Sequence, residues 1–168
     1  MILSERDIQI DFQSASSARK FDEKGFKSPQ GMKLVDFVVY ERNRTLLIEV
    51  KDPSNPNPKA RQDGFEEEFR SNTLIAQELV PKARDSYTFE HLMARDAKPF
   101  IFVVLIGTEK LTLTTAEIVE FKDRLLARLR KETNVEWAHQ YVKDCVVVNI
   151  ETWKSNFPDY PIDRLSAS

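Results

Sequence analysis

Seven consecutive apolar residues, Phe100 to Ile106, place the strongest constraint on how this chain can fold. A strand without polar alternation must be covered on both faces, as happens when helices pack on the two sides of a sheet. The run is far shorter than the roughly 20 residues that a membrane helix needs, so we expect no membrane span. The strand therefore predicts an α/β fold in which helices flank a β-sheet.

Helices are predicted on both sides of this strand along the chain. The helix after it should begin with a capping box formed by Thr114 and Glu117. The first helix before it should be stopped or kinked by Pro81. The predicted helices run from an N-cap at Asp63 to about Leu79, over residues 82–95, and from Thr114 through Leu129.

Length and composition indicate a single domain. Of the 168 residues, 41% are hydrophobic, and we assign residues 1–168 to one domain, with a core at about 8–151 and an aromatic C-terminal tail at 152–168. The formal net charge of -2 gives no general attraction to polyanions, so binding of nucleic acid needs a local basic patch. The single cysteine, Cys145, and the lack of a leader-like start make a cytoplasmic location the expectation.

Residues 35–40 and 46–51 are predicted to form a hairpin that gathers charges on one face. In each strand, one alternating set of residues is wholly apolar. A one-residue slip would turn one apolar set to the other side, so burial forces the two apolar faces to coincide. The opposite faces then coincide too, and they carry Asp36, Glu49 and Lys51. The apolar sets are Val35, Phe37 and Val39 in one strand and Leu46, Ile48 and Val50 in the other.

The turn decides which of the three charges oppose each other. A two-residue loop at positions 42–43 places Asp36 opposite Glu49, whereas a loop at positions 43–44 places Asp36 opposite Lys51. Opposed carboxylates on a sheet repel by roughly 0.2–1 kcal/mol, and by more when they are desolvated. A cation is therefore expected between the two acids.

A hard divalent cation meets this need. Mg²⁺ binds one or two protein carboxylates, keeps several waters and leaves positions for phosphate oxygens. A bound metal acidifies water and stabilises the charge that grows on a phosphoryl group during displacement. Lys51 can orient the attacking water, act as its base if its pKa is lowered, or neutralise the phosphate. The sequence leaves these three roles open.

The same residues resemble a known motif. The segments VDFVVY and IEVKD resemble the PD-(D/E)xK motif of restriction-endonuclease-like nucleases, with Asp36 as the acid of the second core strand and Glu49 and Lys51 in the third. The resemblance implies that Asp36, Glu49 and the Val50 carbonyl bind Mg²⁺ or Mn²⁺ and that Lys51 assists the water. It also implies a mixed sheet flanked by helices and a metal-dependent endonuclease that hydrolyses phosphodiester bonds, with DNA as the expected substrate.

The chain departs from the family pattern at two points. Val35 replaces the proline that precedes the aspartate. The family usually has a helix before its first strand, often with a further acidic residue, and only about seven residues precede the strand expected to start at Ile8. The candidates for that further acid are Glu5, Asp11 and Asp22.

Basic residues close to the motif are candidates for phosphate contacts. Lys59 and Arg61 lie in a proline-rich segment that is predicted to be a stiff, exposed loop. Basic residues of the helix that follows Thr114 alternate with acidic ones, so they are assigned to a solvated face. His91 and His139 lack the spacing of metal ligands and are assigned to the surface.

Two other functions and one assembly are also compatible with the sequence. A nuclease fold without activity would bind nucleic acid or a protein partner, and a plain interaction domain would use the aromatic tail. Trp153, Phe157 and Tyr160 are predicted chiefly to cover the core, while the tail is also a candidate homodimer contact. A homodimer is expected because a duplex has two strands and each chain offers one site.

Overall fold

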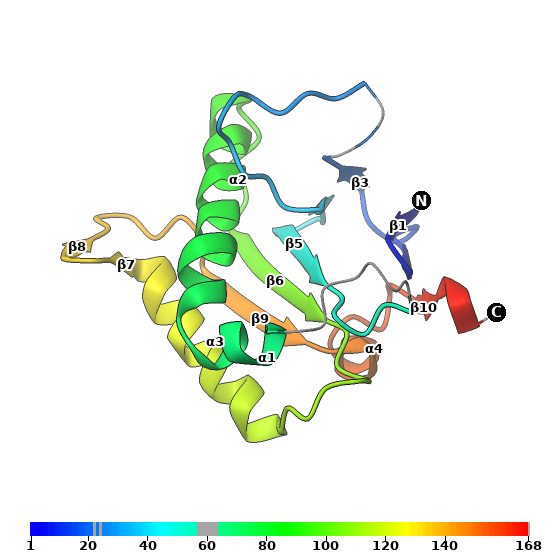
Figure 1. Cartoon of the computed structure of the whole chain (residues 1–168). Coiled ribbons are helices and arrows are strands. Elements are labelled where there is room, and N and C mark those ends of the chain that lie inside the picture. The colour runs from blue at the N-terminus through cyan, green and yellow to red at the C-terminus, as the bar shows by residue number, and fades with distance from the viewer. Residues whose placement is uncertain (22, 24, 57–63, 168) are drawn as a thin grey trace.

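The computed structural model describes residues 1–21, 23, 25–56 and 64–167 (Figure 1). The strands are β1 (Ile2–Glu5), β2 (Ile8–Asp11), β3 (Ser17–Lys20), β4 (Phe37–Tyr40), β5 (Thr45–Lys51), β6 (Phe100–Ile106), β7 (Lys131–Glu132), β8 (Val135–Glu136), β9 (Asp144–Val148) and β10 (Ile162–Arg164). The helical segments are α1 (Phe65–Arg70), the π-helical η1 (Ile75–Leu79), α2 (Val80–Leu92), α3 (Thr115–Arg130), α4 (Ile150–Asn156) and the 3-10 segment η2 (Leu165–Ala167). Within the described ranges, no helix combines the length and hydropathy needed to cross a bilayer.

Five strands form a mixed sheet in the order β3-β4-β5-β6-β9. Strand β4 is antiparallel to both neighbours, whereas β5, β6 and β9 are parallel. One face is covered by α1, η1, α2 and α3, and the other by α4 and a small β1-β2-β10 sheet (Figure 1). The predicted mixed sheet flanked by helices is therefore confirmed.

Strand β6 lies inside the sheet and is buried on both faces. Phe102 and Val104 pack in the core beneath α2 and α3, and Val103 and Leu105 pack in the core beneath α4. All seven residues of the strand are buried. The unbroken apolar run thus predicts its place between two covered faces correctly.

The hairpin adopts the first of the two predicted registers. Tyr40 pairs with Thr45, and the Glu41 N–H donates to the Arg44 carbonyl at 2.9 Å, which closes a two-residue loop at positions 42–43. Asp36 directly precedes β4, so extending this register places it opposite Glu49.

Val35 does not share the apolar face predicted for it. The regular strand begins only at Phe37, and Val35 packs in the core on the α2 side. Its N–H donates to the Ser86 hydroxyl of α2 at 2.9 Å. The chain therefore runs toward α2 before the strand starts, and the predicted alternation of faces holds only from Phe37 onward.

The helix predicted from Asp63 to Leu79 is interrupted. Gly64 occupies the N-cap position of α1, at a φ of 82° that favours glycine, and Asp63 lies outside the described residues. Ser71 has extended backbone, and its hydroxyl accepts a hydrogen bond from the Thr73 N–H at 3.3 Å. This local bond offers the backbone an alternative to the helical ladder, so α1 ends after six residues.

Pro81 does not stop the helical stretch that was predicted to end there. Helical backbone runs from η1 into α2, with Pro81 as the second residue of α2. Proline has no N–H to donate to the Gln77 carbonyl, which instead accepts from Lys33 Nζ at 3.3 Å. The preceding turn widens, and the Val80 N–H bonds the Ile75 carbonyl five residues back.

The capping box predicted at the start of α3 is present. The Thr114 side chain accepts from the Glu117 N–H, and the Glu117 carboxylate accepts from the Thr114 N–H at 2.8 Å. Two backbone donors at the helix start are thereby satisfied, as this sequence pattern predicts.

The loop after Lys51 is buried at its start, contrary to the predicted exposed loop. Asp52, Ser54 and Asn55 are each at most 5% exposed. The Ser54 hydroxyl donates to the Gly107 carbonyl at 2.8 Å, and a side chain at position 107 would overlap the Asp52 carboxylate. The prolines restrict the backbone, but buried polar contacts set the position of this segment.

The aromatic C-terminal segment is part of the core. Trp153 is fully buried, and its indole N–H donates to the Tyr160 carbonyl at 2.8 Å. Phe157 and Tyr160 are each 5% exposed. The predicted core-covering role is confirmed, and these three side chains leave little exposed surface for a homodimer contact or a docking site. The homodimer itself stays a prediction.

Candidate active site

Glu49 is a buried carboxylate with one oxygen paired and one unpaired. Its Oε1 accepts from Lys82 Nζ at 2.6 Å and lies 3.0 Å from Lys51 Nζ. Its Oε2 is buried and has no hydrogen-bond partner among the described residues. An unpaired buried oxygen of this kind costs free energy unless a donor or a cation reaches it.

Asp36 lies beside Glu49 in an environment that disfavours its charge. Asp36 Oδ2 accepts from the Val50 N–H at 2.7 Å. Burial, followed by the charge of Glu49, raises the pKa of Asp36 to about 7, although Lys82 and the Val50 N–H act in the opposite direction. The two predicted carboxylates are thus brought together at the point where β4 begins.

The Val50 backbone points to the same place. In a β-strand the N–H and C=O of one residue point to the same side, so the Val50 carbonyl is directed to the side on which its N–H meets Asp36. The Val50 side chain packs on the opposite face, in the core beneath α4. Two carboxylates and a carbonyl therefore face one region, although no group of three or more His, Cys, Asp or Glu suited to a metal occurs in the described part of the chain.

Lys51 lies in the same cluster and keeps its proton. Its ammonium group contacts the carboxylates of Glu49 and Glu78. Burial favours the neutral amine, but the charge of Glu49 and the hydrogen bond to Glu78 outweigh it, so the pKa of Lys51 is raised. Of the three roles left open by the sequence, this favours orienting the water or neutralising the phosphate over acting as a base.

Two residues of the cluster, Glu78 and Lys82, were not predicted. Glu78 lies in η1 and Lys82 in α2, four residues further on, so both project from one helical face toward β5. Their i,i+4 spacing is visible in the sequence. The expectation that Pro81 ends a helix between them conceals it.

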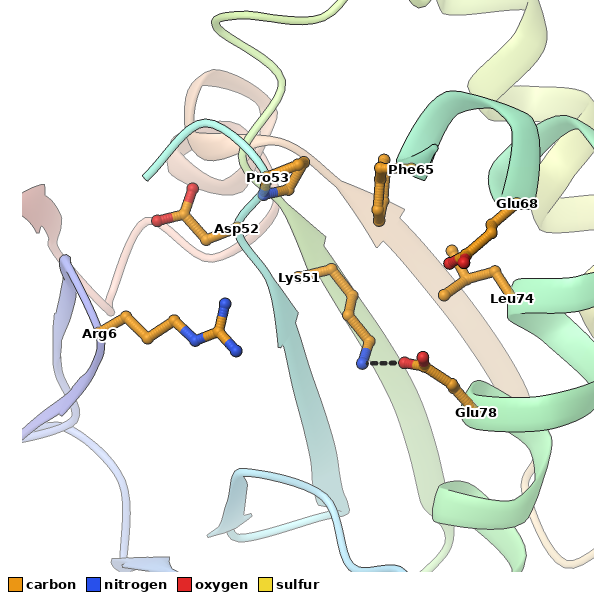
Figure 2. A pocket seen from close by; sticks show the side chains of 8 residues that line it. All are labelled: Arg6, Lys51, Asp52, Pro53, Phe65, Glu68, Leu74 and Glu78. Carbon is orange, nitrogen blue, oxygen red and sulfur yellow. Dashed lines mark hydrogen bonds and ion pairs between the residues drawn. The ribbon is translucent and has the colours of Figure 1, made fainter. Parts of the chain in front are cut away.

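A cavity of about 320 Å³ opens beside Lys51 (Figure 2). Phe65 and Leu74 form an apolar part of its wall, and Lys51 meets Glu78 across it. Arg6 reaches toward the same space from the turn between β1 and β2. The residues that line the cavity are Arg6, Lys51, Asp52, Pro53, Phe65, Glu68, Leu74 and Glu78.

The remaining predicted residues are placed unequally. Lys59, Arg61 and Asp22 lie outside the described residues. Of the other candidate acids, Glu5 pairs with Lys20 at 2.9 Å and its charge raises the pKa of Asp36. Asp11 instead accepts from the Gln13 N–H, lies 3.7 Å from the N-terminal amine and does not line the cavity.

The histidines stay outside this cluster. His91 is exposed, contacts the Asp96 carboxylate and stacks on Tyr87. His139 is exposed as well. Neither residue lines the cavity beside Lys51, in agreement with the absence of metal-ligand spacing around them.

Replacing Asp36 by asparagine is expected to stabilise the metal-free protein at pH 8 by about 2 kcal/mol. The folded-state pKa of about 7 lies above the ordinary 3.8, so the stability linked to this proton is fully present below pH 3.8 and is lost as the pH rises to about 7. A shift of this size corresponds to about 4 kcal/mol, and solvent screening at this incompletely buried position removes about half.

Urea denaturation in EDTA at pH 5 and pH 8 measures this effect. The asparagine oxygen can still accept from the Val50 N–H, so the change removes the charge with little loss of hydrogen bonding. The gain should be smaller at pH 5 than at pH 8. Asp11→Asn, on β2, is the matched control and should show no such gain. Equal gains for Asp36→Asn at both pH values would contradict the role of the buried charge.

No family model, no curated protein and no solved structure matches this chain. The description of the site is therefore based on the residues of this chain alone.

Proposed function

We propose that this protein is a metal-dependent nuclease that hydrolyses phosphodiester bonds of nucleic acid, with DNA as the expected substrate. The observation that carries the proposal is the unpaired, buried Oε2 of Glu49 beside Asp36, whose pKa is raised to about 7 by burial and by the charge of Glu49. A divalent cation would satisfy both groups.

The chemistry of the donor set fits Mg²⁺ or Mn²⁺. Asp36, Glu49 and the Val50 carbonyl would hold the ion, and all three offer the oxygen ligands that hard cations prefer. When bound, the ion supplies Lewis acidity and an acidified water. Lys51 remains protonated and can neutralise a phosphate oxygen, while Glu78 fixes the position of its ammonium group.

The positions of these residues in the sheet support the proposal. Asp36 directly precedes β4, the second strand in the sheet order, and Glu49 and Lys51 lie in β5, the third. The motif resemblance implies this placement. Two parts of the family pattern are not met: Val35 stands where the family has proline, and no helix precedes the first strand of the main sheet, β3, because the short strands β1 and β2 of the separate small sheet occupy that stretch.

Cleavage assays test the proposal directly. Plasmid DNA, single-stranded DNA and RNA are incubated with Mg²⁺ or Mn²⁺, beside Glu49→Gln and Lys51→Ala proteins purified in the same way. Metal-dependent cleavage by the wild-type protein that both substitutions reduce supports the proposal. Cleavage that persists unchanged in both variants would come from another source and would reject this site.

One contact favours a second candidate, a nuclease-like module that binds nucleic acid without cutting it. Lys82 and Lys51 already neutralise one oxygen of Glu49, so part of the charge balance is met without a metal. Binding of nucleic acid without cleavage under any metal condition would select this candidate.

Mg²⁺ is expected to raise the melting temperature of the wild-type protein and not that of Asp36→Asn. At a metal concentration ten times Kd, mass action gives about 1.4 kcal/mol, which corresponds to about 3–5 °C for a chain of this length. Differential scanning fluorimetry over a range of MgCl₂ concentrations measures the shift, with Asp11→Asn as the control that keeps it. Equal shifts in wild type and Asp36→Asn would place metal binding elsewhere.

A further inference from the structure

Arg6 stands at the tip of the β1-β2 hairpin and projects into the cavity beside Lys51 (Figure 2). Its side chain is 58% exposed, and its ion pair with the neighbouring Glu5 is long, at 3.9 Å. Its φ of 53° is left-handed, which residues other than glycine adopt infrequently. Glu5 pairs with Ile8, so Arg6 and Asp7 form a two-residue hairpin turn, which calls for a positive φ at a central residue.

Asp7, the residue after Arg6, fixes the position of the hairpin tip. The Asp7 carboxylate accepts from the Ser166 N–H at 2.9 Å, from the Ser166 hydroxyl at 2.7 Å and from Arg164 at 3.1 Å. The Asp7 carbonyl accepts from the Leu165 N–H at 2.9 Å. The hairpin tip is thus fixed on β10 and η2, while the Arg6 side chain is left free to meet solvent.

Arg164 ties this tip to the loop that follows Lys51. Its guanidinium donates to both oxygens of Asp52, at 2.8 and 3.0 Å, as well as to Asp7. The Arg164 side chain therefore bridges the residue after Arg6 and the residue after Lys51. The two cations that face the cavity are held across from each other by the same contact.

Binding of a phosphate group in this cavity requires a cation other than Lys51. Lys51 is already paired with two carboxylates, and Asp52 is neutralised by Arg164. Glu68 and Glu78 also line the wall and would repel a polyanion. Among the described lining residues, Arg6 is the cation whose ion pair is the weaker one, a single contact of 3.9 Å with Glu5.

We propose that Arg6 is a phosphate-binding residue of this cavity, which contacts a phosphodiester oxygen of the bound nucleic-acid strand. The inference rests on the proposed nuclease function and deepens it. A guanidinium suits the task because its planar fork can donate two parallel hydrogen bonds to phosphate oxygens. The exposed side chain can do so without breaking a buried contact.

Binding measurements test the role of Arg6 apart from catalysis. Fluorescence anisotropy uses a labelled single-stranded 20-mer DNA and the matching duplex, with the Glu49→Gln protein as background and salt between 50 and 200 mM. Arg6→Gln should weaken binding about tenfold and reduce the slope of log K against log salt by about 1. Arg6→Lys should keep the slope and recover part of the affinity, because it keeps the charge and loses the fork.

Arg42→Gln is the matched control, since Arg42 is an exposed arginine in the turn at the opposite end of β5 from Lys51. It should leave both affinity and slope unchanged. If Arg6→Gln equals this control while the wild-type protein cleaves DNA, the Arg6 inference is wrong and the proposed function stands. If the wild-type protein neither binds nor cleaves nucleic acid, both are wrong.

Discussion

Replacing Glu49 by glutamine is expected to lower the rate of metal-dependent cleavage by about 10³-fold. Glutamine has nearly the same shape, but it removes the charge of a side chain that is 1% exposed and that offers an unpaired oxygen to a cation. Charge stabilisation by a bound metal contributes several kcal/mol, and a loss of about 4 kcal/mol corresponds to about 10³ in rate. Initial rates on plasmid DNA with Mg²⁺ and with Mn²⁺ measure the effect.

Two controls separate this loss from misfolding. Circular dichroism should show that Glu49→Gln keeps the wild-type fold, since Lys82 and Lys51 can still donate to the amide oxygen. Glu66→Gln, at a carboxylate on α1 that is not among the residues lining the cavity, should cleave at the wild-type rate. A folded Glu49→Gln protein with more than about a tenth of the wild-type rate would exclude Glu49 as a metal ligand.

Replacing Arg164 by methionine is expected to lower the free energy of unfolding by about 3–5 kcal/mol. The Arg164 side chain is 14% exposed and pairs with Asp52, whose side chain is fully buried, and with Asp7 and Glu109. Removing one partner of a buried ion pair leaves an uncompensated buried charge, which accounts for a loss of this size. Urea denaturation at pH 7 measures it.

The pH dependence and a second arginine provide the checks. Hydrogen bonds to Ser166 and Arg164 oppose burial and hold the pKa of Asp7 below its usual range, so this contribution is present above pH 4 and is lost as the pH falls. The difference between wild type and Arg164→Met should therefore shrink in acid. Arg70→Met, which removes an exposed arginine paired with Glu66 and Glu117, should cost far less than Arg164→Met. Equal losses for the two variants would show that Arg164 contributes no more than a surface pair.

Local alternation predicts the part of the site that lies on neighbouring strands. The apolar faces of β4 and β5 must coincide, and this places Asp36, Glu49 and Lys51 on one face in either of the two predicted registers, while the turn selects the register that forms. The unbroken β6 and the capping box of Thr114 are equally local signals, and both are present. In each case the interaction that decides the structure lies within a few residues or across one tight turn.

Contacts between distant segments account for what the sequence did not predict. Glu78 and Lys82 reach β5 because a π-helical turn carries the helix past Pro81, and tertiary packing decides whether proline breaks a helix or is accommodated. The burial of Asp52 depends on Arg164, 112 residues further along the chain. No local pattern links those two positions, so the proline-rich composition alone suggested an exposed loop.

The bridge made by Arg164 also sets the order in which the site can mature during translation. Arg6 and Lys51 leave the ribosome early, but the side chain that fixes both of their neighbours is 112 residues beyond Asp52. At about 5–20 residues per second, Arg164 is synthesised roughly 6–22 s after Asp52 and roughly 8–31 s after Asp7, which lies 157 residues before it. A nascent chain or a fragment that ends before Arg164 would carry the acidic residues and the lysine without their final alignment, so catalytic competence would follow completion of this long-range contact.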